Sequence, residues 1–196
     1  MTSVFDVAAD ITERAGGSIE ALKLQKLCFY SFGWHAHLTA QPLFPETFYA
    51  LRLGPVVGEL LHAHSGQRQV DGSTISAHRK TADEPPQALD EYTKDVLGAV
   101  WKAYGSASSS QLVRLTHTES AWSDAWKSRG ASQRGELPHA DLISYFLARE
   151  PRPDEGLELP PPAVFRVSPT ALVQLEKQEG PHLRFADAVR AYGSAL

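Results

Sequence analysis

The chain has 196 residues, which is enough for one hydrophobic core or for one domain with an appendage. Hydrophobic residues make up 42% of it and charged residues 21%, a composition that excludes an intrinsically disordered chain. The net charge of −4 gives no bulk attraction to nucleic acid or to an acidic membrane surface, so we expect neither as a partner.

The first predicted element is an N-terminal amphipathic helix. Ser3 with Asp6 predicts a capping box at its start. Gly16-Gly17 is expected to end it, because glycine adopts the conformations that stop a helix. Ser18 is then expected to cap the next helix, which spans residues 21–39.

The helix at residues 21–39 is the one around which the rest of the chain is expected to pack. Two adjoining apolar stripes cover most of its circumference, and such a helix packs on several sides. Gly33, which costs about 1 kcal/mol relative to Ala within a helix, indicates the close approach of another backbone. The side chains expected to be buried are Leu24, Leu27, Cys28, Phe29, Phe32, Trp34, Ala36 and Leu38.

The next segment favours a short strand followed by a helix. Residues 47–53 alternate in the manner of a strand. Gly54-Pro55 is expected to start a helix that ends near Gly66, because proline is tolerated at the first helical position. Asp71-Gly72 gives a weak signal for a small hairpin.

The second half of the chain predicts four more helices and then a linker. The helices begin near Ala88, after the serine run 106–110, at Ser120 and at Pro138. The proline-rich segment 151–163 predicts a stiff, partly extended linker.

The sequence therefore predicts a mainly α fold with two parts. Residues 1–150 are expected to form a compact multi-helix domain around a buried central helix, with a short β-strand or hairpin. Residues 164–196 are expected to form a small C-terminal strand/helix extension. So short a segment buries little core alone, so it is expected to dock on the first domain or on a partner.

Motifs that would indicate catalysis or metal binding are missing from the sequence. The eight histidines include the pairs His35/His37 and His62/His64, whose members face different ways on a helix. The sequence has no His-Glu-x-x-His, Cys-x-x-Cys, Gly-x-Ser-x-Gly, Gly-x-Gly-x-x-Gly or P-loop motif. We therefore expect no catalytic residue, no metal and no cofactor.

Three features of the sequence favour the cytoplasm. The single cysteine, Cys28, excludes an internal disulfide and fits a reducing compartment. No apolar run approaches the roughly 20 residues that span a membrane. The first residues lack the basic and apolar regions of a signal peptide.

Three segments together resemble a known family. Leu24–His35 (LQKLCFYSFGWH), Leu51–Val57 (LRLGPVV) and Leu112–Trp122 (LVRLTHTESAW) are similar, in order and spacing, to the signatures of the Panacea domain, also called SocA-like or phage-associated GepA-like. The resemblance covers roughly residues 3–149. Cys28-Phe29, Leu51 and Ala121 depart from the usual Leu-Tyr, aromatic and Pro, and these exchanges leave the fold expectation intact.

The resemblance implies an antitoxin of a bacterial or phage two-gene toxin–antitoxin system that neutralises its cognate protein toxin by direct binding. One branch of the family instead delivers its toxin to a AAA+ protease, so a proteolytic adaptor is the first alternative. A small hydrolase using His117 or His35 is the second. A DNA-binding autorepressor is disfavoured because the sequence lacks a basic patch. The sequence leaves homo-oligomerisation open.

Two groups of residues are expected to contact the partner. The first lies in the helical domain and comprises Tyr30, Gly54, Pro55 and Trp122. The second lies in the C-terminal extension, whose short amphipathic helices need cover for their apolar faces. It comprises Phe165, Leu172, Leu175, Phe185, Val189 and Tyr192. The alternative for the extension is that it folds back permanently and completes the core.

Overall fold

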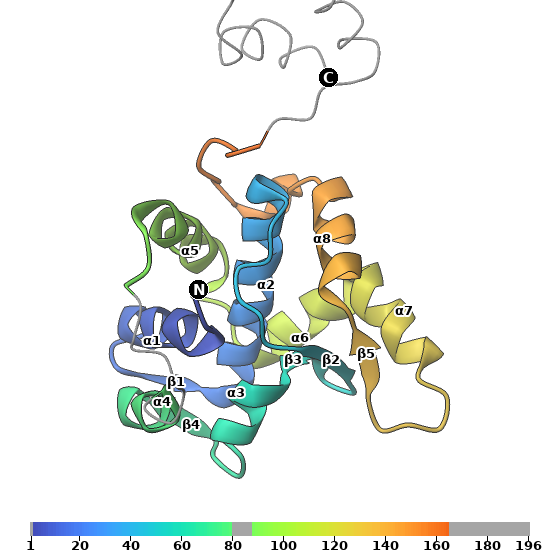
Figure 1. The fold of residues 1–196 in the computed structure, drawn as a ribbon, viewed down its shortest axis with the longest axis horizontal. Coiled ribbons are helices and arrows are strands. Elements are labelled where there is room, and N and C mark those ends of the chain that lie inside the picture. Colours follow the sequence, from blue (N-terminus) through green and yellow to red (C-terminus); the bar gives the residue numbers. More distant parts are fainter. Residues whose placement is uncertain (1, 80–87, 165–196) are drawn as a thin grey trace, which may run out of the picture. The chain divides into compact units, whose positions relative to one another are not determined.

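Helix α2 (Ala21–Thr39) is the central element of the computed structural model, which describes residues 2–79 and 88–164 (Figure 1). Every residue of α2 from Leu24 to Trp34 is buried, and so is Leu38. The prediction of a central, buried helix is therefore confirmed. Helices α1, α5, α6 and α8 and strand β3 all pack against it.

Another element packs tightly against α2 at Gly33, although through a side chain and not through its backbone, as was expected. A Cβ added at Gly33 would overlap the ring of Phe146 on α8 (His139–Ala148). An aromatic side chain, rather than another main chain, therefore requires glycine here.

The N-terminal region combines two helices with a two-stranded sheet. The Ser3–Asp6 capping box starts α1 (Val4–Arg14), as predicted. Ser18, however, does not cap α2. It belongs to strand β1 (Ser18–Glu20), which pairs antiparallel with β4 (Gln69–Asp71).

The predicted hairpin at Asp71-Gly72 is also wrong. Asp71 ends β4, and its carboxylate accepts a hydrogen bond from the backbone N–H of Thr74, 2.9 Å away. Its side chain thus binds the first turn of α4 (Gly72–Arg79), and a helix follows the strand instead of a turn.

The second sheet has three antiparallel strands in the order β3-β2-β5. Strand β2 (Phe48–Leu51) pairs Tyr49 with Val56 of β3 (Gly54–Val57) and with Glu136 of β5 (Gly135–Leu137). The prediction that Gly54-Pro55 starts a helix is therefore wrong. Pro55 lies on an edge strand, where its missing N–H is tolerated, and helix α3 (Gly58–Ala63) begins only after β3.

The four helices predicted for the second half are present. They are α5 (Glu91–Tyr104), α6 (Ser109–Thr118), α7 (Ser120–Ser128) and α8. A capping box of Ser108 and Gln111 starts α6, so the serine run does supply the cap. With eight α-helices and five short strands among the described residues, the predicted mainly α fold is confirmed.

The chain divides into two units, Met1–Pro161 and Pro162–Leu196. The first ends with a 3-10 turn at Pro153–Glu155 within the segment expected to be a linker. The helices expected after residue 168 lie outside the described residues. No helix in the described ranges is long and apolar enough to cross a membrane.

Candidate functional site

Two neighbouring side chains of α2 close the outer edge of the three-stranded sheet. Gln25 accepts a hydrogen bond from the backbone N–H of Val57 (2.8 Å) and donates one to the carbonyl of the same residue (3.4 Å). Lys26 Nζ donates to the carbonyl of Pro55 (2.8 Å). We call Gln25 and Lys26 the β3 clamp, because their side chains occupy the positions that a further strand would take.

The β3 clamp explains the glycine and proline that follow β2. Gly54 has a φ of 100°, which favours glycine, and an added Cβ would lie 2.8 Å from Lys26 Nζ and 2.7 Å from Thr116 Oγ1. Lys26 is fully buried, and this burial lowers its pKa to about 7. The Gly-Pro pair therefore lets the chain pass close to a buried amine.

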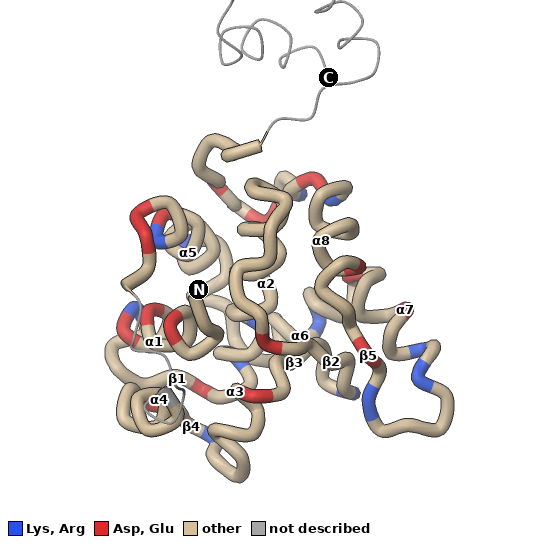
Figure 2. Tube along the Cα trace, in the orientation of Figure 1, with Lys and Arg blue, Asp and Glu red and all other residues tan. Residues whose placement is uncertain are grey.

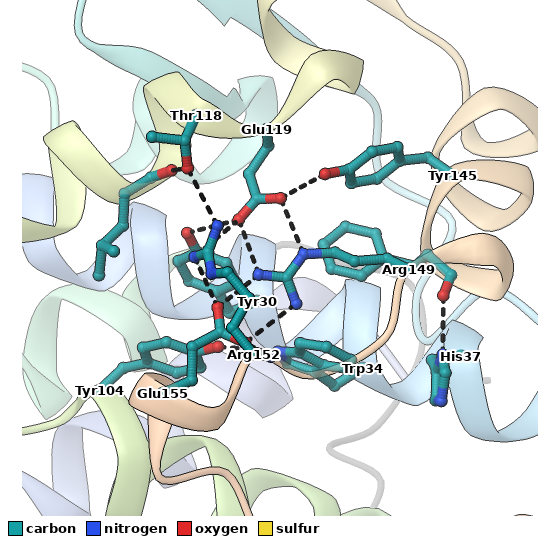
Figure 3. Close-up of polar contacts among 12 residues, drawn as sticks. Tyr30, Trp34, His37, Tyr104, Thr118, Glu119, Tyr145, Arg149, Arg152 and Glu155 are labelled. Carbon is teal, nitrogen blue, oxygen red and sulfur yellow. Dashed lines mark hydrogen bonds and ion pairs between the residues drawn. The ribbon is translucent and has the colours of Figure 1, made fainter.

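A buried carboxylate joins the other parts of the domain (Figure 3). Glu119 is the residue between α6 and α7, and its side chain is 1% exposed. Arg149 binds it with two hydrogen bonds, from Nε to Oε2 (2.9 Å) and from Nη2 to Oε1 (3.1 Å). The hydroxyls of Tyr30 and Tyr145 also donate to it, the former over 3.1 Å.

A second carboxylate extends this group towards the 3-10 turn. Glu155 pairs with Arg149 and, over 2.7 Å, with Arg152. Although burial opposes the shift, the hydrogen bonds from Arg149 hold the pKa of Glu155 below its usual value. The negative charges of the two carboxylates are thus matched by the positive charges of the two guanidinium groups. We call these four residues, together with Tyr30 and Tyr145, the Glu119 cluster.

Aromatic rings enclose the Glu119 cluster on the α2 side (Figure 3). The rings of Tyr30 and Tyr104 stack with their centroids 4.4 Å apart. The indole N–H of Trp34 donates to the Tyr104 hydroxyl over 3.2 Å, and the Arg149 guanidinium lies 4.5 Å from the centre of the Trp34 ring. Burial and then the charge of Glu119 raise the pKa of Tyr30, so its hydroxyl stays a donor.

A stack of planar groups ties α6 and α7 to the turn between β2 and β3. The rings of His117 and Trp122 lie parallel with centroids 3.9 Å apart, and Trp126 stacks on Trp122 at 6.2 Å. The guanidinium of Arg129 lies over the ring of Trp126, 3.5 Å from its centre. Trp122 also donates from its indole nitrogen to the carbonyl of Leu51 (3.0 Å).

A hydrolase using His117 would need a hydroxyl and a carboxylate beside it, and the nearby candidates in sequence, Thr116 and Glu119, are engaged elsewhere. The hydroxyl of Thr116 donates to the carbonyl of Val113 (3.0 Å), His117 lies against Trp122, and Glu119 binds Arg149. Burial and then the charge of Lys26 lower the pKa of His117. These contacts stabilise the fold and leave no nucleophile–base pair among the three.

The other histidine considered for catalysis lies apart from His117, on α2. A ring nitrogen of His35 is 3.3 Å from the carbonyl of Gln41 and the same distance from the hydroxyl of Thr39. Within the described ranges, no group of three or more His, Cys, Asp or Glu side chains could hold a metal ion.

The expected contact residues fall into two sets. Tyr30, Gly54, Pro55 and Trp122 are all buried in this conformation, so they offer a partner little accessible surface. Their expected contact with a partner remains a prediction. The six residues of the second set lie outside the described residues: Phe165, Leu172, Leu175, Phe185, Val189 and Tyr192.

Sequence reasoning missed several residues that the structure makes prominent. Arg149 and Glu155 follow the recognised signatures, and no local pattern connects them with Glu119. Leu61, which falls within the helix predicted between Gly54-Pro55 and Gly66, is exposed, whereas Leu60 is buried. A signal for this existed, because Leu60 and Leu61 are adjacent and cannot both face inwards on one helix.

One comparison with known proteins gave a match. The family model described as "Antitoxin SocA-like, Panacea domain" matches residues 24–123, just over half of the chain. Neither the curated proteins nor the solved structures gave a match. The matched segment contains the β3 clamp, the carboxylate of Glu119 and the ring of Trp122. The chain therefore belongs to the SocA-like antitoxin family, which is defined by the Panacea domain.

Proposed function

We propose that the chain is the antitoxin of a bacterial or phage toxin–antitoxin pair, and that it neutralises its cognate protein toxin in the cytoplasm by binding it directly. The observation that carries this proposal is the family match over residues 24–123. A family match supports a role in general, whereas the particular toxin depends on surfaces specific to this chain.

The internal contacts of the signature residues support binding rather than catalysis. Gln25, Lys26 and Glu119 hydrogen-bond to other parts of the same domain, and they are 1%, 0% and 1% exposed, respectively. Residues so deeply buried can shape a surface, but they cannot reach a substrate. The signatures therefore fit a scaffold that presents a binding surface.

Co-expression with the neighbouring gene tests the proposal. The product of that gene is expected to stop growth when expressed alone and to be tolerated when this chain is expressed with it. The two purified proteins should then form a complex on gel filtration. A neighbouring product that remains toxic in the presence of this chain would refute the proposal.

The same experiment separates direct blocking from proteolytic delivery. Direct binding predicts that neutralisation persists in cells that lack the AAA+ protease, and that the amount of toxin in the cell stays unchanged. Loss of neutralisation in those cells, together with a longer toxin lifetime, would identify the chain as a proteolytic adaptor instead.

A further inference from the structure

Two exposed apolar side chains lie in the same hollow of the surface. Among the described residues, Leu53 and Leu61 are two of the three large hydrophobic residues that are exposed, at 47% and 37%. Both line a hollow of about 370 Å³, together with Val56. A second hollow of about 280 Å³ shares Val56 and Leu61 with the first. We call these two adjoining hollows the Leu61 groove.

Arginines lie at both parts of the Leu61 groove. Arg68 lines the larger hollow and Arg134 the smaller one, and no ion pair within the described ranges joins either of them to an acid. Figure 2 shows basic residues on the segment between α7 and β5, which begins at Arg129 and ends at Arg134. Among the described residues, Glu20 is the only acid that lines either hollow, and its carboxylate accepts a hydrogen bond from Ser109. The groove is thus apolar and positively charged on a chain whose net charge is −4.

The β3 clamp determines how a partner can bind beside this groove. Both backbone groups of Val57 and the carbonyl of Pro55 are already hydrogen-bonded to Gln25 and Lys26. A partner strand cannot extend the sheet at β3, because these groups are not free. A partner must instead insert side chains into the groove.

We propose that the Leu61 groove is the toxin-binding surface and that it takes an amphipathic acidic segment of the toxin. Apolar side chains of that segment enter the hollows on either side of Leu61, and its Asp or Glu side chains pair with Arg68 and Arg134. Charge complementarity of this kind raises the association rate and selects the partner. This inference rests on the proposed function and names the surface that performs it.

Photo-crosslinking from the groove tests which molecule occupies it. The full chain, with benzoyl-phenylalanine at position 61, is mixed with the purified toxic product of the neighbouring gene and irradiated. The expected product is a crosslink to a toxin peptide that contains both apolar and acidic residues. The matched control carries the same group at position 114, an exposed residue of α6 that lines neither hollow, and should give no crosslink.

Substitutions on the surface test the chemistry of the groove without disturbing the core. Arg68→Glu combined with Arg134→Glu should weaken toxin binding about tenfold or more and remove most of its dependence on salt. Leu53→Ser should also weaken binding, whereas Leu61→Met, which stays apolar, should bind like the parent. Arg114→Glu reverses one positive charge outside the groove and should leave affinity within about twofold of the parent. Circular dichroism confirms that each variant is folded.

The outcomes separate this inference from the proposed function. A complex that forms normally with the double arginine variant, or that gives no crosslink from position 61, would overturn the groove and leave the antitoxin role intact. A crosslink from position 61 to a peptide of this chain, from the same or a second copy, would also overturn the groove. Failure of the unmodified chain to bind or neutralise the toxic product would refute both the role and the surface.

Discussion

Replacing Glu119 with Ala should strongly destabilise the domain. Glu119 is almost fully buried, and Arg149 binds it with two hydrogen bonds. Its removal leaves the Glu119 cluster with one negative and two positive charges, and leaves the hydroxyls of Tyr30 and Tyr145 without their acceptor. Removing one partner of a buried ion pair costs about 3–5 kcal/mol, because the other charge remains buried.

Urea unfolding followed by tryptophan fluorescence measures this loss, since the chain has four tryptophans. For a domain of this size, about 3–5 kcal/mol corresponds to a fall in melting temperature of roughly 6–20 °C. Glu119→Gln should lie between the parent and Glu119→Ala, because the amide oxygen still accepts a hydrogen bond.

Glu158→Ala is the matched control. Glu158 also pairs with a cation, Lys102 Nζ at 2.6 Å, but both side chains of this pair are largely exposed. An exposed ion pair contributes little to stability because water and salt screen it, so the control should unfold at nearly the same urea concentration as the parent. If Glu119→Ala unfolds within about 1 kcal/mol of the control, the assignment of Glu119 as the buried link between the helices is wrong.

Three further predictions concern stability. Between about pH 7 and 10, the unfolded chain keeps Lys26 protonated, whereas the folded chain, in which its pKa is about 7, releases the proton. The free energy of unfolding should therefore rise between about pH 7 and 8.5, by at most about 1.4 kcal/mol per pH unit. Lys26→Met should flatten this rise in urea titrations at each pH. Gly33→Ala should lower the free energy of unfolding by about 1–3 kcal/mol, because the added Cβ overlaps the ring of Phe146. Gly98→Ala is the control: its Cβ would have its nearest neighbour at 3.5 Å, so this change should stabilise the protein by up to about 1 kcal/mol. Equal effects of the two changes in thermal melts would contradict the packing of Phe146 against Gly33. A chain ending at Pro161 should melt as a folded domain, whereas one ending at Pro151 loses the ion pairs of the 3-10 turn and should melt at a lower temperature.

Features determined by neighbouring residues were predictable from the sequence. The capping boxes at Ser3 and Ser108 depend on side chains three residues apart, and both are present. The burial of α2 follows from an apolar pattern within one helix. In each case the physical cause lies within a few residues of its effect.

Features that depend on residues far apart in the chain were not predictable. Ser18 pairs with Asp71 in a sheet, and a serine before a helix looks the same in sequence as a helix cap. Gly54-Pro55 suits both the start of a helix and an edge strand, and the contacts of Gln25 and Lys26 decide between them. The partner of Glu119, Arg149, lies thirty residues further along the chain.

The β3 clamp has a consequence for the order in which the protein is completed during translation. Gln25 and Lys26 precede β3 in the chain, so the side chains that close this edge of the sheet leave the ribosome before the strand that they cover. An uncovered strand on a nascent chain can pair with other chains and aggregate, and here its cover is made first. Arg149 and Glu155, in contrast, are translated after α8, the last α-helix of the described residues, which ends at Ala148. The sheet edge can therefore be protected early in synthesis, while the ion pairs that join the helices form only once the domain is almost complete.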